Sequence, residues 1–298
     1  GRGPEAPGPP AGGPRSRDDA MDDHPLLGPV IDVRSRFAAE RAALVSLLRS
    51  LTPEQWAAEA VPGWSARDLA AHLLGDDYGR LAGRRDGYRP GPGLAPGETI
   101  ARLVHRENAL WVEGTRRISP AALADTLEVT GRWIADLWRD ADLHAPSISV
   151  DWAGVDPAPT WFDCAREFTE YWTHRQQIRL AAGLPADLGP QAAGPVLDTF
   201  LRALPHTLRD VAAEPGTRAR VEVEGPAGGT WTAVRTDGGW VHDPSEGAGA
   251  DAAVRLDADT AWRMCTRMIE PQEAARRGVL TGDRGLAAAC CRIVSILR

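Results

Sequence analysis

The sequence predicts a two-domain protein, with an all-helical first part and a small α+β second part. Its 298 residues suffice for two ordinary domains. Before Pro215-Gly216 the apolar residues recur every three or four positions, as in amphipathic helices, whereas after it they alternate, as in strands. We therefore expect a disordered tail over residues 1–25, a helical bundle over 26–187, and a linking helix with a small α+β domain over 188–298.

Start and stop signals divide the first part into helices. Ser65, followed three residues later by Asp68, resembles a capping box and starts the helix that contains His72. Thr52-Pro53-Glu54 opens a short helical turn before it. The other expected helices cover residues 30–51, 98–117, 119–138, a segment that ends near Gly183, and 191–211.

Short alternating segments after Pro215-Gly216 predict strands. Residues 220–224 and 230–234 alternate between polar and apolar side chains, and Gly238-Gly239 is typical of a hairpin turn. Two more short strands are expected at 240–242 and 253–256, and helices at 260–266 and 285–297.

The composition excludes several classes of function. A net charge of −7 and the absence of a basic tract argue against nucleic acid as a partner. No apolar run approaches the roughly 20 residues that span a bilayer, and no signal-like segment is present. All 34 basic residues are arginine, which indicates a GC-rich bacterial genome. We expect a cytoplasmic protein, because the four cysteines lack metal or redox spacing: Cys164, Cys265, Cys290 and Cys291. The last three lie in apolar helical runs and resemble core residues.

Three residues carry the strongest chemical signal. Glu170 and His174 are four residues apart, so a helix places them on one face. His72 lies in a separate predicted helix. One carboxylate and two imidazoles can hold a divalent ion and leave one coordination position open, which is typical of a catalytic metal. We therefore predict a metal site at His72, Glu170 and His174.

The neighbours of these residues strengthen the prediction. Apolar residues surround them: Leu69, Leu73, Phe168 and Trp172. This implies burial, and a buried carboxylate must be paired or bind an ion. Asp68 and Asp76, four residues on either side of His72, can each orient its imidazole, although helix capping explains Asp68 equally well. The remaining histidines have no mutual spacing and are interpreted as surface or packing residues: His105, His144, His206 and His242.

Two segments together resemble the mycothiol-dependent maleylpyruvate isomerase family. They are residues 63–73, GWSARDLAAHL, and residues 170–179, EYWTHRQQIR. That family belongs to the DinB-like metal-binding helical bundles. Residues 281–287, TGDRGLA, are similar to the sterol-carrier-like C-terminal domain found in the same family. The resemblance covers essentially everything after residue 25.

The resemblance implies a DinB-like four-helix bundle that binds a divalent ion, usually zinc, through His72, Glu170 and His174. Mycothiol would bind at the open position as the thiol cosubstrate, and coordination would remove its proton near neutral pH. The thiolate would then add to an electrophilic small molecule, as in maleylpyruvate cis–trans isomerisation or in thiol S-transfer. Arginines are available to hold an anionic substrate: Arg67, Arg102, Arg175, Arg263 and Arg267.

Two other interpretations of the same residues stay open. In the first, the chain is a non-catalytic, metal-containing protein that binds a ligand or regulates a partner. A fourth protein ligand would favour it, and Glu167, one turn before Glu170, is the best candidate. In the second, no metal binds and the three residues form a buried hydrogen-bonded cluster.

Overall fold

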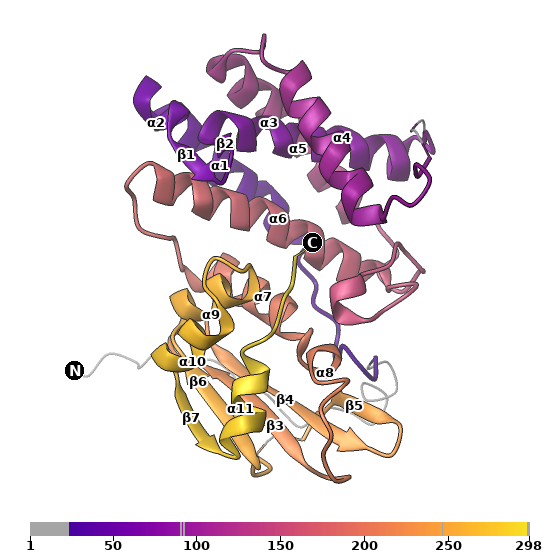
Figure 1. The fold of residues 1–298 in the computed structure, drawn as a ribbon. Helices are drawn as coiled ribbons and strands as arrows, with labels where there is room; N and C mark the ends of the chain where they lie inside the picture. Colours follow the sequence, from indigo (N-terminus) through magenta and orange to yellow (C-terminus); the bar gives the residue numbers. More distant parts are fainter. Residues whose placement is uncertain (1–23, 90, 92, 246, 297–298) are drawn as a thin grey trace, which may run out of the picture.

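The chain consists of a helical half and a half built on a β-sheet (Figure 1). The computed structural model describes residues 24–89, 91, 93–245 and 247–296. The helical first part and the mixed second part agree with the sequence-based prediction. The predicted disordered tail, residues 1–25, falls almost wholly outside the described residues. Within the described residues, no helix combines the length and the apolar character that a membrane span requires.

Four long helices form the core of the helical half. They contact one another in a ring, α1 with α5, α5 with α3, α3 with α6, and α6 with α1. Buried side chains such as Leu44, Leu73, Leu127 and Phe168 fill the space between them. The elements of this half are η2 (Arg34–Arg36), α1 (Phe37–Ser50), α2 (Pro53–Ala57), β1 (Glu59–Val61), β2 (Trp64–Ser65), α3 (Ala66–Arg80), η3 (Leu81–Arg85), α4 (Ile100–Gly114), α5 (Pro120–Arg139), η4 (Asp151–Ala153) and α6 (Thr160–Ala181).

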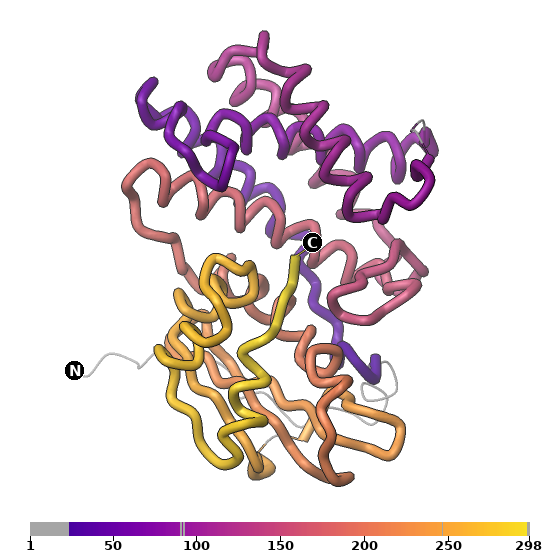
Figure 2. The backbone as a smooth tube through the Cα atoms, in the orientation of Figure 1, coloured from indigo at the N-terminus to yellow at the C-terminus, as the bar shows by residue number. Residues whose placement is uncertain are grey.

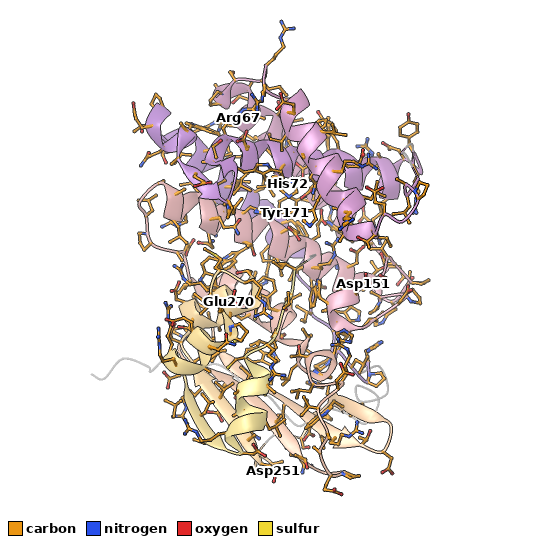
Figure 3. All side chains as sticks on the ribbon, viewed as in Figure 1. Arg67, His72, Asp151, Tyr171, Asp251 and Glu270 are labelled. Carbon is orange, nitrogen blue, oxygen red and sulfur yellow. The ribbon has the colours of Figure 1, made fainter. Side chains whose placement is uncertain are left out.

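A buried polar cluster centred on Asp77 ties these four helices together. Asp77 of α3 is fully buried, and Arg41 of α1 donates to its two carboxylate oxygens at 2.6 and 2.7 Å. The hydroxyl of Tyr171 on α6, labelled in Figure 3, donates to it at 2.6 Å. Thr130 of α5 donates as well. Because a buried carboxylate must keep its partners, these contacts hold all four helices in one arrangement.

Helix α4 packs on α3 through a tryptophan. Gly75 makes the close approach feasible, because a Cβ there would lie 2.7 Å from the Trp111 indole ring. Nε1 of Trp111 donates to the carbonyl of Ala71 at 2.7 Å, one residue before His72. Val112 is the α4 residue with a buried side chain, so much of α4 borders solvent.

The second half is a five-stranded sheet with helices packed on it. The strand order is β5-β4-β3-β6-β7, and the β3–β6 pair is parallel whereas the other pairs are antiparallel. In β3 the buried Ala219, Val221 and Val223 alternate with half-buried residues, so one face of the sheet carries the core. The elements are α7 (Pro190–Leu201), α8 (Leu204–Thr207), β3 (Arg218–Val223), β4 (Gly229–Thr236), β5 (Gly239–His242), β6 (Ala252–Leu256), α9 (Ala258–Cys265), α10 (Pro271–Arg277), β7 (Val279–Gly282) and α11 (Arg284–Cys290).

Three predicted helices differ from the structure. The helix expected from residue 30 begins as α1 only at Phe37, after the 3-10 turn η2. The helix expected over 191–211 is broken into α7 and α8, because Pro205 near the start of α8 has no amide hydrogen to continue α7. The terminal helix expected over 285–297 ends at Cys290, after which the chain turns back toward the helical half (Figure 2). There Ser295 donates to the carbonyls of Cys265 and Phe200.

The two halves meet along α6 and α7. Trp172 of α6 packs edge-on against Trp262 of α9, with ring centroids 5.5 Å apart. The first described residues also reach the sheet, because the amide of His242 donates to the carbonyl of Pro25. Helix α10, strand β7 and the β1–β2 hairpin were not expected from the sequence, since each is short and lacks a clear apolar period.

Candidate metal centre

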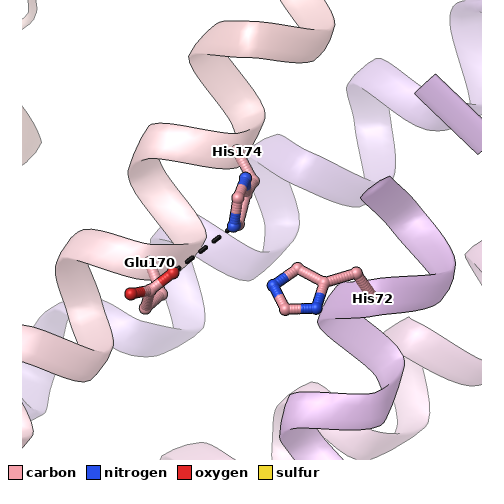
Figure 4. A group of neighbouring side chains, drawn as sticks. All are labelled: His72, Glu170 and His174. Carbon is pink, nitrogen blue, oxygen red and sulfur yellow. Dashed lines mark ion pairs between the residues drawn. The ribbon is translucent and has the colours of Figure 1, made fainter. Parts of the chain in front are cut away.

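The three residues predicted to bind a metal converge between α3 and α6 (Figure 4). His72 comes from α3, and Glu170 and His174 come from α6. One ligand atom from each lies within 4.8 Å of the other two. Nε2 of His174 is 3.3 Å from a carboxylate oxygen of Glu170, and the two imidazole rings are nearly perpendicular, with centroids 4.9 Å apart. The geometry therefore places one carboxylate and two imidazoles around a common point.

Local secondary structure orients these side chains toward that point. The Ser65–Asp68 capping box is present and starts α3 two turns before His72. Trp64, from the strand that precedes the cap, packs against the His72 ring with centroids 5.4 Å apart. On α6, the four-residue spacing puts Glu170 and His174 on one face. The exposed side-chain fraction is 9% for His72, 15% for His174 and 29% for Glu170, so the cluster is only partly shielded from solvent.

Burial and neighbouring groups together shift the pKa values of His72 and Glu170. Burial lowers the pKa of His72 to about 3, and the neighbouring His174 acts in the same direction. Burial by itself would raise the pKa of Glu170, but the hydrogen bond and charge of His174 outweigh it and bring that pKa to about 2. A neutral imidazole and an ionised carboxylate are the forms that bind divalent ions.

This arrangement predicts acid sensitivity of the metal-free protein. Unfolded His72 has the ordinary pKa of 6.5 and folded His72 one of about 3, so the unfolded state gains a proton first as the pH falls. The free energy of unfolding should therefore decrease below pH 6.5, by about 1.4 kcal/mol per pH unit and about 2 kcal/mol by roughly pH 5. Urea denaturation in the presence of a chelator measures it. The His72→Gln variant should show a shallower pH dependence, and an equal slope in both proteins would contradict the prediction.

A glutamine supports one of the two imidazoles. Oε1 of Gln177 lies 2.7 Å from Nδ1 of His174, on the side of the ring away from Glu170. With the proton on Nδ1, His174 donates to Gln177 and keeps the lone pair of Nε2 directed at the cluster. Such outer partners orient metal ligands. The sequence-based prediction did not include Gln177, although it follows His174 by three residues and therefore lies on the same helix face.

Removing this support should weaken metal binding without unfolding the protein. We expect Gln177→Leu to lower zinc affinity by about 10- to 100-fold, the usual cost of losing an outer partner. Gln177→Glu should retain the affinity, because a carboxylate also accepts from Nδ1. Competition with a chromophoric chelator measures both. Equal zinc affinity of the leucine variant and the unsubstituted protein would show that Gln177 has no such role.

The other acidic candidates take different positions. Asp68 caps α3 and does not orient His72. Asp76 does contact the imidazole, with a carboxylate oxygen 3.3 Å from Nε2 of His72. Burial and then the charge of Glu170 raise the pKa of Asp76 well above its usual value, although 27% of its side chain is exposed. Glu167, considered as a fourth ligand, instead accepts from Arg80 at 2.6 Å.

The helical half matches a known protein family. Residues 37–179 match the family model described as the mycothiol maleylpyruvate isomerase N-terminal domain. The match begins at Phe37, the first residue of α1, and ends at Arg179 near the end of α6, so the matched segment contains all three residues of the cluster.

Two solved structures resemble the whole chain. One is a mycothiol-dependent maleylpyruvate isomerase, 16% identical over 89% of this chain and 96% of that chain, with a TM-score of 0.49. The other is a histidine-to-alanine mutant of a mycothiol-dependent maleylpyruvate isomerase, 14% identical over the same shares, with a TM-score of 0.48. No curated protein matches the chain.

At least three of the five arginines considered for substrate binding make contacts within the protein. Arg175 is buried and pairs with Glu40 at 2.6 Å, which joins α6 to α1. Arg67 donates to backbone carbonyls at the end of α4, and Arg263 pairs with Asp259. These contacts hold the fold together and leave no basis for assigning any of the three to a substrate.

A groove of about 1060 Å³ lies away from the cluster, between α1 and α5, on the side of the helical half opposite to α3 and α6. A smaller hollow of about 440 Å³ lies where α4, α8 and the terminal segment meet.

Proposed function

We propose that this protein is a divalent-metal-dependent enzyme that uses mycothiol to attack an electrophilic small molecule. The observation that carries the proposal is the convergence of His72, Glu170 and His174 within 4.8 Å inside a mycothiol maleylpyruvate isomerase N-terminal domain. The donor set suits zinc, which favours imidazole and carboxylate ligands at about 2.0–2.2 Å. The ring of α1, α3, α5 and α6 is in keeping with a DinB-like four-helix bundle, and we propose a sterol-carrier-like fold for the second half.

Each residue of the cluster has a defined role in this proposal. His72 and His174 supply neutral nitrogen donors, and Glu170 supplies the single negative charge that offsets part of the charge of the ion. A divalent ion bound there would lower the pKa of a thiol at its open position, which gives a nucleophile at neutral pH. Trp64 covers one side of His72 and limits access of water to it.

The nucleophilic thiol must come from a cosubstrate. All four cysteines of the chain are buried. Burial raises the pKa of Cys290 to about 12 and that of Cys291 to about 11, and it also raises the pKa values of Cys164 and Cys265. A buried thiol of this kind is protonated and unreactive at neutral pH. This supports an external thiol such as mycothiol.

In the isomerase version, the sulfur of mycothiol bonds to one carbon of the cis double bond of maleylpyruvate. Rotation about the resulting single bond follows. Breaking the carbon–sulfur bond then restores the double bond in the trans form and releases the thiol. In the S-transfer version, the carbon–sulfur bond is retained and the neighbouring carbon takes up a proton, so the thiol is consumed. The two versions therefore differ in whether the adduct eliminates the thiol or is protonated.

One experiment tests the proposal and separates the two versions. Purified protein with zinc and mycothiol is added to maleylpyruvate, and its enol absorbance is followed together with the free thiol concentration. Isomerisation should change the absorbance at constant thiol, whereas S-transfer should consume thiol in proportion to product. An absence of any thiol-dependent change would contradict the isomerase version. Co-purified metal equal in His174→Ala and the unsubstituted protein would contradict metal dependence.

A further inference from the structure

A ladder of buried polar contacts joins α3 to α6 beside the metal cluster. Arg80 of α3 donates to Glu167 of α6 at 2.6 Å and to both oxygens of Asp163 at 3.0 and 3.2 Å. One turn further along, Tyr171 of α6 donates to Asp77 of α3 at 2.6 Å. The residue numbers rise on α3 as they fall on α6, so the helices are antiparallel. The metal cluster adjoins this ladder, because Glu170 and His174 lie on either side of Tyr171 on α6 and His72 lies five residues before Asp77 on α3.

These contacts would be lost if α3 and α6 were aligned differently. Asp77 and Asp163 are fully buried, Glu167 is nearly so, and 12% of the Arg80 side chain is exposed. A shift of α3 by one turn, about 5.4 Å, would leave several charges buried without partners. Breaking a buried pair is strongly destabilising, whereas an intact pair adds little stability over apolar residues of the same volume. The ladder therefore discriminates between alignments more than it stabilises the fold.

Apolar packing alone does not select the alignment. Helix α6 buries side chains on all its sides, including the continuous run of residues 160–165 and most of residues 167–178. Because side chains are buried all round α6, no single apolar stripe fixes which face of this helix packs against α3. The α3 segment 69–74 is likewise buried without interruption. The polar contacts supply the specificity that the apolar pattern lacks.

We infer that Arg80 and Tyr171 are positioning residues that set the α3–α6 register and so bring His72 to Glu170 and His174. The inference rests on the proposed function, because the register matters to the ion that these three residues would share. His72 lies eight residues before Arg80, about 12 Å along α3. A slip at Arg80 would therefore carry the imidazole away from its partners on α6 and leave a two-ligand site.

Metal affinity and the visible spectrum of the cobalt-substituted protein test this inference. Tyr171→Phe removes a single hydroxyl and should lower zinc affinity by about tenfold, with a larger loss for Arg80→Gln. The cobalt spectrum should change in both variants, because it reports the number and geometry of ligands. Arg80→Lys should recover part of the affinity, since an ammonium group can pair with one of the two carboxylates.

Glu40→Gln is the matched control. It breaks the buried Glu40–Arg175 pair, which joins α1 to α6 and does not involve α3. It should reduce stability while zinc affinity stays within about a factor of two and the cobalt spectrum is unchanged, because the contacts between α3 and α6 stay in place. Equal effects of Glu40→Gln and Tyr171→Phe on affinity and spectrum would overturn the inference alone. Absence of zinc binding by the unsubstituted protein would overturn the proposed function together with it. If Arg80→Gln does not fold, Tyr171→Phe decides.

Discussion

Replacing His174 with alanine should abolish metal binding while the protein stays folded. The variant keeps His72 and Glu170, which together offer two ligands from different helices, too few to hold a zinc ion firmly. We expect zinc affinity to fall by more than about 100-fold, beyond the range seen for outer partners alone. Thiol-dependent activity should fall with it, because nothing else in the described residues lowers the pKa of a bound thiol in this way. Equilibrium dialysis with metal analysis measures the affinity.

The fold should survive this change because apolar side chains hold the helices. Phe168 and Trp172 of α6 are buried and do not depend on His174. Circular dichroism should therefore be unchanged at room temperature. His144→Ala is the control, since His144 is exposed and lies outside the cluster, and it should bind zinc like the unsubstituted protein. If His174→Ala retained full zinc content, the ion would be held elsewhere and the cluster would have no role in binding it.

Replacing Asp77 with alanine should cause the largest loss of stability in the helical half. The change leaves Arg41, a buried residue of α1, without the carboxylate that accepts two of its hydrogen bonds. It also removes the acceptor of Tyr171. Removing one partner of a buried pair costs about 3–5 kcal/mol, because the remaining charge has lost its solvent and its counter-charge. Urea denaturation followed by helical circular dichroism measures the free energy of unfolding.

A surface ion pair on the same helices provides the comparison. Arg49 of α1 pairs with Asp125 and Glu128 of α5 at 2.9 and 2.8 Å, but all three side chains are well exposed. Solvent screens such pairs, so Arg49→Gln should change the denaturation midpoint little. A loss of stability in Asp77→Ala no greater than that in Arg49→Gln would mean that the buried cluster contributes nothing beyond its surface counterpart.

Helical periodicity was sufficient to find the parts of the site. The four-residue spacing of Glu170 and His174 places both on one helix face whatever the rest of the chain does, since that follows from 3.6 residues per turn. The Ser65–Asp68 cap is equally local, and the structure confirms it. Ends of helices were less certain. Pro205 divides one expected helix, and bonds from Ser295 to distant carbonyls draw the terminal segment away from helical structure.

Contacts between helices that are far apart along the chain could not be predicted from the sequence. Glu167 was a plausible fourth ligand by spacing, but Arg80, which lies 87 residues earlier, takes its carboxylate. The support of His174 by Gln177 depends on rotamers that only packing selects. The sequence could not distinguish structural from substrate-binding roles for the five arginines, because a guanidinium group can form a salt bridge or bind an anionic ligand.

The sequence by itself determined the long helices of the helical half and the chemical groups that they carry, because helix geometry, capping and the family motifs act over a few residues at a time. Only the tertiary structure decided that His72 meets Glu170 and His174, and that Asp77 and Arg80 hold α3 in place against α6. The physical reason is that a buried charge must find its partner in space. Where that partner lies depends on how whole helices pack, a property that no local pattern of residues encodes.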